Sequence, residues 1–318
     1  MVDISNSANI QKGTSPMKKI LISGLVNTET TVKVRQFPIN YYPIDYPFFG
    51  VNTTVSGVAY NIALAMKTLG DQVTLLSMTG KDFPAAYIRQ TLSDAGIDAD
   101  RLKAPLKETP SSVVLYDDDG KRQIYCDLKD IQDASYDFSE DICNNYDLIV
   151  ACNINFNRKL LPLAKVAGKI IATDVHVLTN VYDEYNWDFM HYADILFLSD
   201  EGIGENYQGF LQELEYTYGT PIIVLGRGCK GAAMYLKEQD RIIELPAVSV
   251  GQVVNTVGAG DALFSAFVHY YAKGLPPTEC LMRAQLFASA KIGVSGASKG
   301  FVAETIIDEL YRNPKTLV

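Results

Sequence analysis

The stretch NTVGAGD at residues 255–261 combines the features of an anion site with a carboxylate. Small residues at 258–260 leave backbone N–H groups open to an anion. The apolar run ALFSAFVHYY that follows predicts a helix whose dipole favours negative charge at its start. Such donors would stabilise the charge that develops on a transferring phosphoryl group, and Asp261 would accept the proton of an attacking hydroxyl. The stretch therefore predicts phosphoryl transfer to an alcohol.

This chemistry has a cost, because a carboxylate repels a phosphate. The site would need a divalent cation and the exclusion of water. A second interpretation is that Asp261 caps the helix by accepting backbone N–H bonds, while the glycines merely permit a tight turn. The organisation of the rest of the chain favours the first interpretation, because open α/β sheets bind ligands at the carboxyl ends of their strands.

The elements that must position this stretch alternate along the chain. Apolar β-type runs alternate with helical patterns, which is typical of a mostly parallel sheet covered by helices on both faces. Gly70 and Gly96 are expected to end two of these helices. The expected strands are KILISGLV, QVTLLSM, YDLIVAC, KIIATDV, ADILFLS and TPIIVLG, and the expected helices are VAYNIALAMKTLG, DFPAAYIRQTLSDAGI, NRKLLPLAKVAG and GFLQELEYTYG.

Two segments interrupt this alternation. Residues 30–55 are rich in Val, Tyr, Phe and Pro without helical spacing, and residues 108–128 contain a hairpin that turns at Asp119-Gly120. Together they predict a small sheet that projects from the main one and acts as a lid. The aromatic cluster FPINYYPIDYPFF is expected to pack in the lid or to form a dimer surface there. A further hairpin, GAAMYLKEQDRIIELP, is expected to extend the edge of the main sheet.

Composition excludes several classes of protein. The 318 residues carry a net charge of −9 without a Lys/Arg run, which argues against a nucleic-acid surface. The five cysteines are widely spaced, so we expect reduced, buried thiols in a cytoplasmic protein. The sequence contains no membrane span, and residues 1–16 are polar and are expected to lie outside a single domain of residues 17–318.

The sequence GRGCKG matches the pattern GxGxxG through Gly226, Gly228 and Gly231. A dinucleotide fold needs a helix after this turn, whereas AAMYL predicts another strand. We therefore expect no dinucleotide fingerprint here.

At this point the sequence resembles the PfkB or ribokinase-like carbohydrate kinases over most of the chain from residue 17. NTVGAGDALFSAF is similar to their C-terminal signature DTxGAGDxF. GLVNTE at residues 24–29 is similar to their GxxNxD segment, and Ser56-Gly57 with Asn61 resembles their GGxxxNxAxxxxxLG segment. GRGCKG fits their nucleotide-side loop. The resemblance implies a three-layer α/β/α fold with a small β lid.

The resemblance also implies ATP-dependent phosphorylation of a hydroxyl, with Mg²⁺ and often a monovalent cation such as K⁺. It makes Asp261 the general base and residues 258–260 the anion hole. The residues that it assigns to ligands are Asn27, Glu29, Gly57 and Asn61 for the acceptor, Gly228, Gly231, Thr256, Gly258, Gly260, Gly296 and Ser298 for the nucleotide, and Glu201 for the metal.

Four departures from the family pattern leave alternatives open. Glu29 replaces an Asp, Ser56 replaces a Gly, and Asn255 replaces an Asp near the expected monovalent cation. SDEGIGEN stands where the family has NxxE, which leaves Glu201 as the nearest acid. A sugar is the expected acceptor, and a nucleoside, including one of the pseudouridine type, is the alternative. A nucleotide-binding regulator without catalysis is a third possibility.

The remaining polar residues carry weaker expectations. Asp174 ends an expected strand, at the edge of the sheet where a side chain can face the cleft, while His176, His191 and His269 are expected mostly in packing or surface roles. A dimer through the lid would cover its edges.

Overall fold

The computed structural model describes residues 18–294 and 296–313, so the predicted N-terminal extension at 1–16 lies outside the described residues. A nine-stranded sheet forms the centre of the molecule, in the order β13-β12-β11-β10-β9-β8-β1-β4-β5. The strands from β11 to β5 pair in parallel, and β12 and β13 add an antiparallel hairpin at one edge. The bounds are β1 Lys19–Ser23, β4 Gln72–Met78, β5 Asp98–Lys103, β8 Leu148–Ala151, β9 Ile170–Val177, β10 Ile195–Ser199, β11 Ile222–Gly226, β12 Ala232–Leu236 and β13 Arg241–Leu245.

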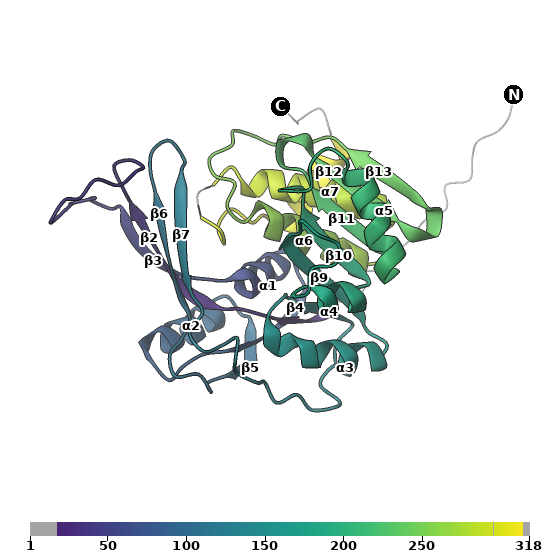
Figure 1. Cartoon of the computed structure of the whole chain (residues 1–318), viewed down its shortest axis with the longest axis horizontal. Coiled ribbons are helices and arrows are strands. Elements are labelled where there is room, and N and C mark those ends of the chain that lie inside the picture. Colours follow the sequence, from purple (N-terminus) through teal and green to yellow (C-terminus); the bar gives the residue numbers. More distant parts are fainter. Residues whose placement is uncertain (1–17, 295, 314–318) are drawn as a thin grey trace, which may run out of the picture.

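Helices cover both faces of this sheet, as the alternating pattern predicts (Figure 1). The inner strands are apolar on both sides because each face is buried against a helical layer. One layer contains α1 Val58–Leu69, α2 Phe83–Asp94, α6 Ala259–Ala272, α7 Pro277–Lys291 and α8 Glu304–Arg312, and the other contains α3 Leu160–Val166, α4 Trp187–Tyr192 and α5 Tyr207–Tyr218. Short 3₁₀ helices lie at Asn155–Lys159, Gly228–Lys230 and Lys237–Gln239.

A second, four-stranded sheet projects from the main body, with the strand order β3-β2-β6-β7 (Figure 1). Its strands are β2 Asn27–Lys33, β3 Val51–Ser56, β6 Ser111–Tyr116 and β7 Arg122–Asp127. The hairpin between β6 and β7 turns at Gly120, which adopts φ 81°. The expected small sheet and both expected hairpins are therefore confirmed. We call this sheet and the β2–β3 connection, residues 34–50, the lid.

Short connections join the lid to the main sheet. β1 continues directly into the lid strand β2, and the lid strand β3 leads directly into α1. The lid is thus joined to the carboxyl edge of the main sheet, near the start of α1. α6 packs beside α1 in the same layer, and Phe197 of β10 holds it through edge contacts with Phe264 and Phe267 at 5.1 and 5.3 Å. Packing therefore fixes the amino ends of both helices.

Two expectations need adjustment. All five thiols are free, but Cys126 and Cys229 are exposed, so only Cys143, Cys152 and Cys280 are the expected buried thiols. Cys126 is exposed because it lies on β7, in which every residue is exposed, and Cys229 is exposed because it lies in a surface turn. Within the described ranges, no helix combines the length with the apolar composition that crossing a bilayer requires.

Candidate active site

The amino end of α6 is built from the small residues that the sequence singles out. Gly258 is the N-cap, with φ 76°, and a Cβ at this position would lie 2.6 Å from the carbonyl oxygen of Ala297. Only glycine fits such a backbone in such close contact. The N–H of Ala259 donates to the Thr256 carbonyl oxygen at 3.1 Å, which closes the turn. The next N–H groups of the first helical turn have no partner four residues earlier within the helix.

Asp261 does not cap its helix. It lies in the first turn of α6, and Gly258 occupies the N-cap without a side-chain hydrogen bond, so the capping interpretation is wrong. Its Oδ2 instead accepts a hydrogen bond from Nδ2 of Asn61 at 2.8 Å. Burial raises the pKa of the Asp261 carboxyl above its usual range, while the Asn61 hydrogen bond and, in its protonated form, the His176 ring oppose that rise. A carboxylate with a raised pKa is a better proton acceptor, which suits a general base.

Close backbone contacts also fix the amino end of α1, the helix that carries Asn61. Gly57 is its N-cap with φ 104°, and a Cβ there would lie 2.6 Å from the Leu25 carbonyl oxygen. Gly24 at the end of β1 packs so closely on Cys152 that a Cβ would lie 2.6 Å from its Sγ. Bare backbone at both positions lets β1, α1 and β8 converge beside Asp261.

The predicted acceptor residues lie on the lid side of this point. Asn27 pairs with Ser56 across β2 and β3, and its Nδ2 donates to Oγ of Ser112 at 3.1 Å. The Oγ of Ser56 donates to Glu29 at 3.4 Å, and burial raises the pKa of Glu29 although the Ser56 and Ser112 hydroxyls lower it. These side chains form a row of hydroxyl, amide and carboxylate groups on β2, β3 and β6, and β3 is followed by α1, which carries Asn61.

Two buried side-chain oxygens, one in this row and one on α1, have no hydrogen-bond partner among the described residues. They are Oδ1 of Asn27 and Oδ1 of Asn61, in residues that are 3% and 5% exposed. An unsatisfied buried carbonyl oxygen is costly, and most such atoms in folded proteins have a donor.

β9 contributes a second polar pair at its carboxyl end. Asp174 accepts from the backbone N–H of His176 at 2.8 Å, and its side chain is 12% exposed. His176 adopts φ 60°, which is strained for a non-glycine residue. Both side chains lie close enough to Asp261 to shift its pKa, Asp174 upwards and His176 downwards. Asp174 therefore faces the site, and His176, which the sequence left mainly in a packing role, belongs beside it.

The predicted nucleotide residues divide between two places. Gly296 and Ser298 flank Ala297, which contacts Gly258, so this loop lies at the start of α6 beside Thr256. Gly228 lies in an exposed turn after β11 with φ 53°, and GRGCKG leads from strand to strand as expected. Gly231 serves packing, because a Cβ there would lie 2.1 Å from the Leu245 carbonyl oxygen.

An open pocket of about 670 Å³ lies beside this nucleotide-side turn. Glu201 occupies the turn that follows β10 and is exposed next to the pocket residues Asp200 and Gly202. Among the described residues, no group of three or more His, Cys, Asp or Glu side chains is arranged to hold a metal ion. A magnesium ion that arrives with a nucleotide needs only one or two protein carboxylates, so Glu201 fits that limited role.

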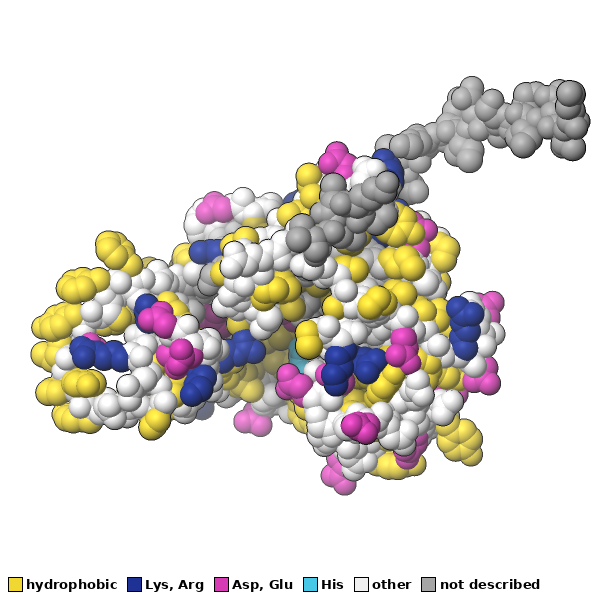
Figure 2. Space-filling model, turned by 90° about the horizontal axis from the view of Figure 1, so that it is seen from above, with side chains coloured by type: hydrophobic (Ala, Val, Ile, Leu, Met, Phe, Trp, Pro, Cys, Tyr) yellow, Lys and Arg dark blue, Asp and Glu magenta, His cyan; other side chains and the backbone are white. Residues whose placement is uncertain are grey.

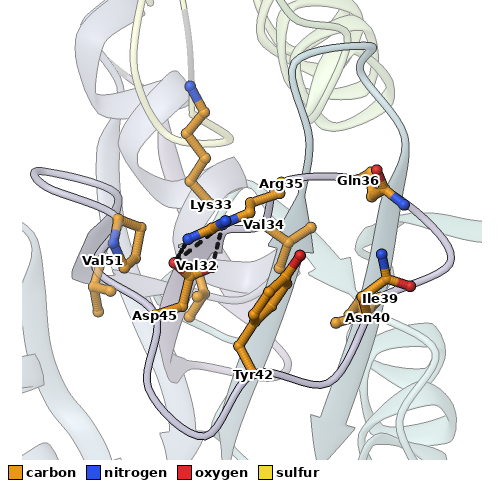
Figure 3. A pocket seen from close by; sticks show the side chains of 11 residues that line it. Val32, Lys33, Val34, Arg35, Gln36, Ile39, Asn40, Tyr42, Asp45 and Val51 are labelled. Carbon is orange, nitrogen blue, oxygen red and sulfur yellow. Dashed lines mark hydrogen bonds and ion pairs between the residues drawn. The ribbon is translucent and has the colours of Figure 1, made fainter.

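A second pocket, of about 330 Å³, belongs to the lid alone (Figure 3). The 34–50 connection folds back on β2 there, and Arg35 binds Asp45 through two nitrogens, at 2.7 Å for the shorter contact. None of the predicted catalytic, acceptor or nucleotide residues lines this pocket. It is therefore not the site of the chemistry described above.

Sequence reasoning missed one residue of the site entirely. Lys291, at the end of α7, is fully buried, and its ammonium donates to the carbonyl oxygen of Val257 just before the α6 turn. Its only sequence signal is a single cation within the apolar run LFASAKIGV. His191, by contrast, is exposed, and His269 is buried far along α6.

Comparison with known proteins identifies the family of the chain. The pfkB family carbohydrate kinase model matches residues 17–304. The chain is 24% identical to the fructosamine kinase FrlD of Bacillus subtilis (strain 168) over 264 residues, which covers 81% of this chain and 89% of that protein. It is also 24% identical to a nucleoside kinase of Methanocaldococcus jannaschii over 287 residues, covering 88% of this chain and 92% of the other.

Solved structures share the fold. The microbiome-derived acarbose kinase Mak1 superposes with a TM-score of 0.84 at 21% identity, covering 93% of this chain and 99% of the other. Arabidopsis thaliana ribokinase, solved with ribose and ATP, superposes with a TM-score of 0.77 at 19% identity, covering 92% and 98%. The expected three-layer fold with its small β sheet is thus confirmed. With a family model that spans nearly the whole described chain, this protein belongs to the pfkB family of carbohydrate kinases.

Proposed function

We propose that this kinase transfers the γ-phosphoryl group of ATP to a hydroxyl of a small, unphosphorylated sugar, with Asp261 as general base. The observation that carries the proposal is the 2.8 Å hydrogen bond from Asn61 to Asp261. This bond joins α1, which follows the lid strand β3, to the carboxylate in the first turn of α6. A sugar bound by the polar side chains of the lid strands would hold one hydroxyl beside Asp261, its proposed proton acceptor, and beside the phosphoryl group.

The anion hole is proposed at residues 258–260, because the first turn of α6 presents N–H groups and the positive end of the helix dipole. The residues proposed to hold the nucleotide are Thr256, Gly296, Ser298, Gly228 and Gly231. Mg²⁺ bound with ATP would neutralise phosphate charge, and Glu201 is the residue proposed to hold it. This chain's own groups would then orient the acceptor, take its proton and exclude water under the lid.

An unphosphorylated acceptor is favoured by the charges of the site. Glu29, Asp174 and Asp261 are carboxylates that would repel a second phosphate. Two cations of the lid that could have clamped such a phosphate are already paired: Lys33 lies 2.7 Å from Asp118, and Arg35 lies 2.7 Å from Asp45. A nucleoside is the second candidate, supported by the similarity to the M. jannaschii nucleoside kinase.

We also propose that a second copy of the chain covers the lid. Figure 2 shows hydrophobic side chains gathered around its projecting end. Phe49 is 100% exposed and Tyr41 is 88% exposed, which a soluble monomer rarely tolerates in a contiguous patch. The exposed apolar residues of this patch are Ile39, Tyr41, Tyr42, Ile44, Tyr46, Phe48, Phe49 and Val51.

ADP release from Mg-ATP across a panel of sugars, sugar phosphates and nucleosides tests the function. The native protein should turn over one or more unphosphorylated sugars, and Asp261→Asn should lose turnover by about 10²–10⁴-fold while ATP affinity stays within a few fold. Turnover of sugar phosphates alone would overturn the assignment of the acceptor class. An Asp261→Asn variant as active as the native protein would overturn the assignment of the base.

A further inference from the structure

Lys291 is a cation without contact to solvent. Its side chain is 0% exposed, and its ammonium donates to the backbone carbonyl oxygen of Val257 in a segment 34 residues earlier. A buried charge is costly, and proteins retain one where it has a specific partner or task. Burial lowers the pKa of Lys291 to about 8, although the charge of Asp261 acts in the opposite direction.

The partner of Lys291 belongs to the loop that builds the proposed anion hole. Val257 immediately precedes Gly258, the N-cap from which α6 begins. The loop is held from the same side by Ile292, whose carbonyl oxygen accepts from the N–H groups of Val254 and Asn255 at 2.9 and 3.0 Å. Ile292 at the end of α7 therefore holds the loop in position, and the neighbouring Lys291 places a positive charge against it.

The resemblance to the family implies a monovalent cation near Asn255, and the residues present do not fit one. Asn255 has no charge, and its Oδ1 already accepts from the N–H of Val257 at 2.8 Å. The carbonyl oxygen of Val257 is occupied by the ammonium of Lys291. A metal ion at these oxygens would compete with the hydrogen bonds that they already accept and would be repelled by the ammonium.

We propose that the ammonium of Lys291 is a resident cation that positions and charges the anion-hole loop, so that phosphoryl transfer needs no monovalent metal ion. The inference rests on the proposed function of this site. Lys291 touches neither substrate in this arrangement, because it acts through the Val257 carbonyl, and it is therefore a positioning residue.

Three substitutions separate charge from packing. Lys291→Met keeps the length of the side chain without its charge, whereas Lys291→Ala also leaves room for an ion beside the Val257 carbonyl. The matched control is Lys273→Met, since Lys273 lies just beyond the other end of α6 and pairs with Glu304. Each variant and the native protein are compared in K⁺, in NH₄⁺ and in tetramethylammonium at equal ionic strength.

The first readout is the Kd of Mg-ATP measured by calorimetry. The native protein and Lys273→Met should bind with the same affinity in all three salts, within about twofold. In tetramethylammonium, Lys291→Met and Lys291→Ala should bind about tenfold more weakly, in proportion to one lost charge-assisted hydrogen bond. K⁺ or NH₄⁺ should restore Lys291→Ala but not Lys291→Met, because only alanine leaves space.

The second readout needs no nucleotide, and it separates this inference from the proposed function. Amide hydrogen exchange over residues 254–260 should be equally slow in every salt for the native protein, and faster in tetramethylammonium for Lys291→Ala. If the native protein binds no ATP, the proposed kinase function fails, and the exchange data still decide the role of Lys291. The inference is overturned if K⁺ raises the ATP affinity of the native protein severalfold or slows its exchange. It is also overturned if both Lys291 variants behave as the native protein does.

Discussion

Asn61 donates from Nδ2 to Oδ2 of Asp261 at 2.8 Å, although the two residues lie 200 positions apart in the chain. Asn61 is on α1, and Asp261 lies in the first turn of α6, which packs beside α1. The bond stabilises the charged form of Asp261, while burial of the carboxyl favours its neutral form. The two largest influences on the pKa of the proposed base are therefore burial, which raises it, and the Asn61 amide, which lowers it.

Replacement of Asn61 should shift the pH dependence of the reaction. Asn61→Leu removes the hydrogen bond that lowers the pKa of Asp261, so the acid limb of log kcat/KM should move to higher pH than in the native protein. The loss of one charge-assisted bond predicts a shift of about one pH unit, because one unit corresponds to about 1.4 kcal/mol. Asn27→Leu is the control, since it removes an acceptor contact that does not touch Asp261. An unchanged acid limb in Asn61→Leu would refute the proposed role of the bond.

Replacement of the N-cap glycines of α6 and α1 should affect different substrates. Gly258→Ala places a Cβ 2.6 Å from the Ala297 carbonyl oxygen, so it should weaken ATP binding by about tenfold or more. Gly57→Ala meets the Leu25 carbonyl oxygen at 2.6 Å on the acceptor side, so it should mainly raise KM for the acceptor.

Gly274→Ala controls for backbone strain in this comparison. Its φ is 84°, but no atom lies within 4 Å of the added Cβ, so it should lose about 1 kcal/mol of stability and keep both affinities. Calorimetry with Mg-ATP and steady-state kinetics with the acceptor measure the three variants. If Gly258→Ala bound ATP normally, the turn at the start of α6 would not hold the nucleotide.

The lid provides a test of oligomeric state. Phe48→Ser and Phe49→Ser replace rings that are 84% and 100% exposed. In a monomer these changes remove little packing, chiefly the stacking of Phe48 on Tyr46, and should alter stability by less than about 0.5 kcal/mol. If a second copy covers the patch, they should convert a dimer into a monomer, because buried aromatic anchors dominate such interfaces. Light scattering after size-exclusion chromatography measures the mass, with Tyr216→Ser, 91% exposed on α5, as the control. A native protein that is monomeric throughout would contradict the lid dimer.

The sequence predicted the elements whose pattern is local. Inner strands such as Gln72–Met78 are mostly apolar and are buried after their first residue, and α1 ends at Gly70 in the left-handed conformation that its glycine suggests. β5, Asp98–Lys103, was not predicted, because DADRLK is an edge strand with a single buried side chain. Its strand conformation depends on pairing with β4, which no local pattern reveals.

The site was predicted to the extent that its chemistry lies in one motif. The sequence identified Asp261, and it identified Asn61 and Gly57 through resemblance, but the hydrogen bond between the helices needs the fold. His176 and Lys291 could not be assigned from sequence, because a lone histidine or lysine has the same appearance in the core, on the surface and in a site. Only the strained φ of 60° at His176 and the complete burial of Lys291 distinguish them.

A buried charge cluster at the far end of α6 should make stability depend on pH. His269 is 2% exposed, and its Nδ1 lies 2.8 Å from Oδ2 of Asp71, while its Nε2 makes only a 3.5 Å ion-pair contact with Glu304. Burial alone would lower the pKa of His269, but Asp71 and Glu304 outweigh it and raise that pKa above its usual 6.5. The stabilisation by charged His269 is therefore complete below about pH 6.5 and is lost as the pH rises through the higher folded-state pKa. At low pH the same cluster weakens, because the pKa of Glu304 is lowered to about 2 and its stabilisation is lost as the pH falls towards that value.

His269→Leu should cost about 3–5 kcal/mol in urea unfolding near neutral pH, since it leaves Asp71 buried without a partner. The difference from the native protein should narrow as the pH is raised, whereas His191→Leu, an exposed histidine on α4, should change stability by less than about 0.5 kcal/mol at any pH. A difference that widened with rising pH would mean that His269 is neutral in the folded protein.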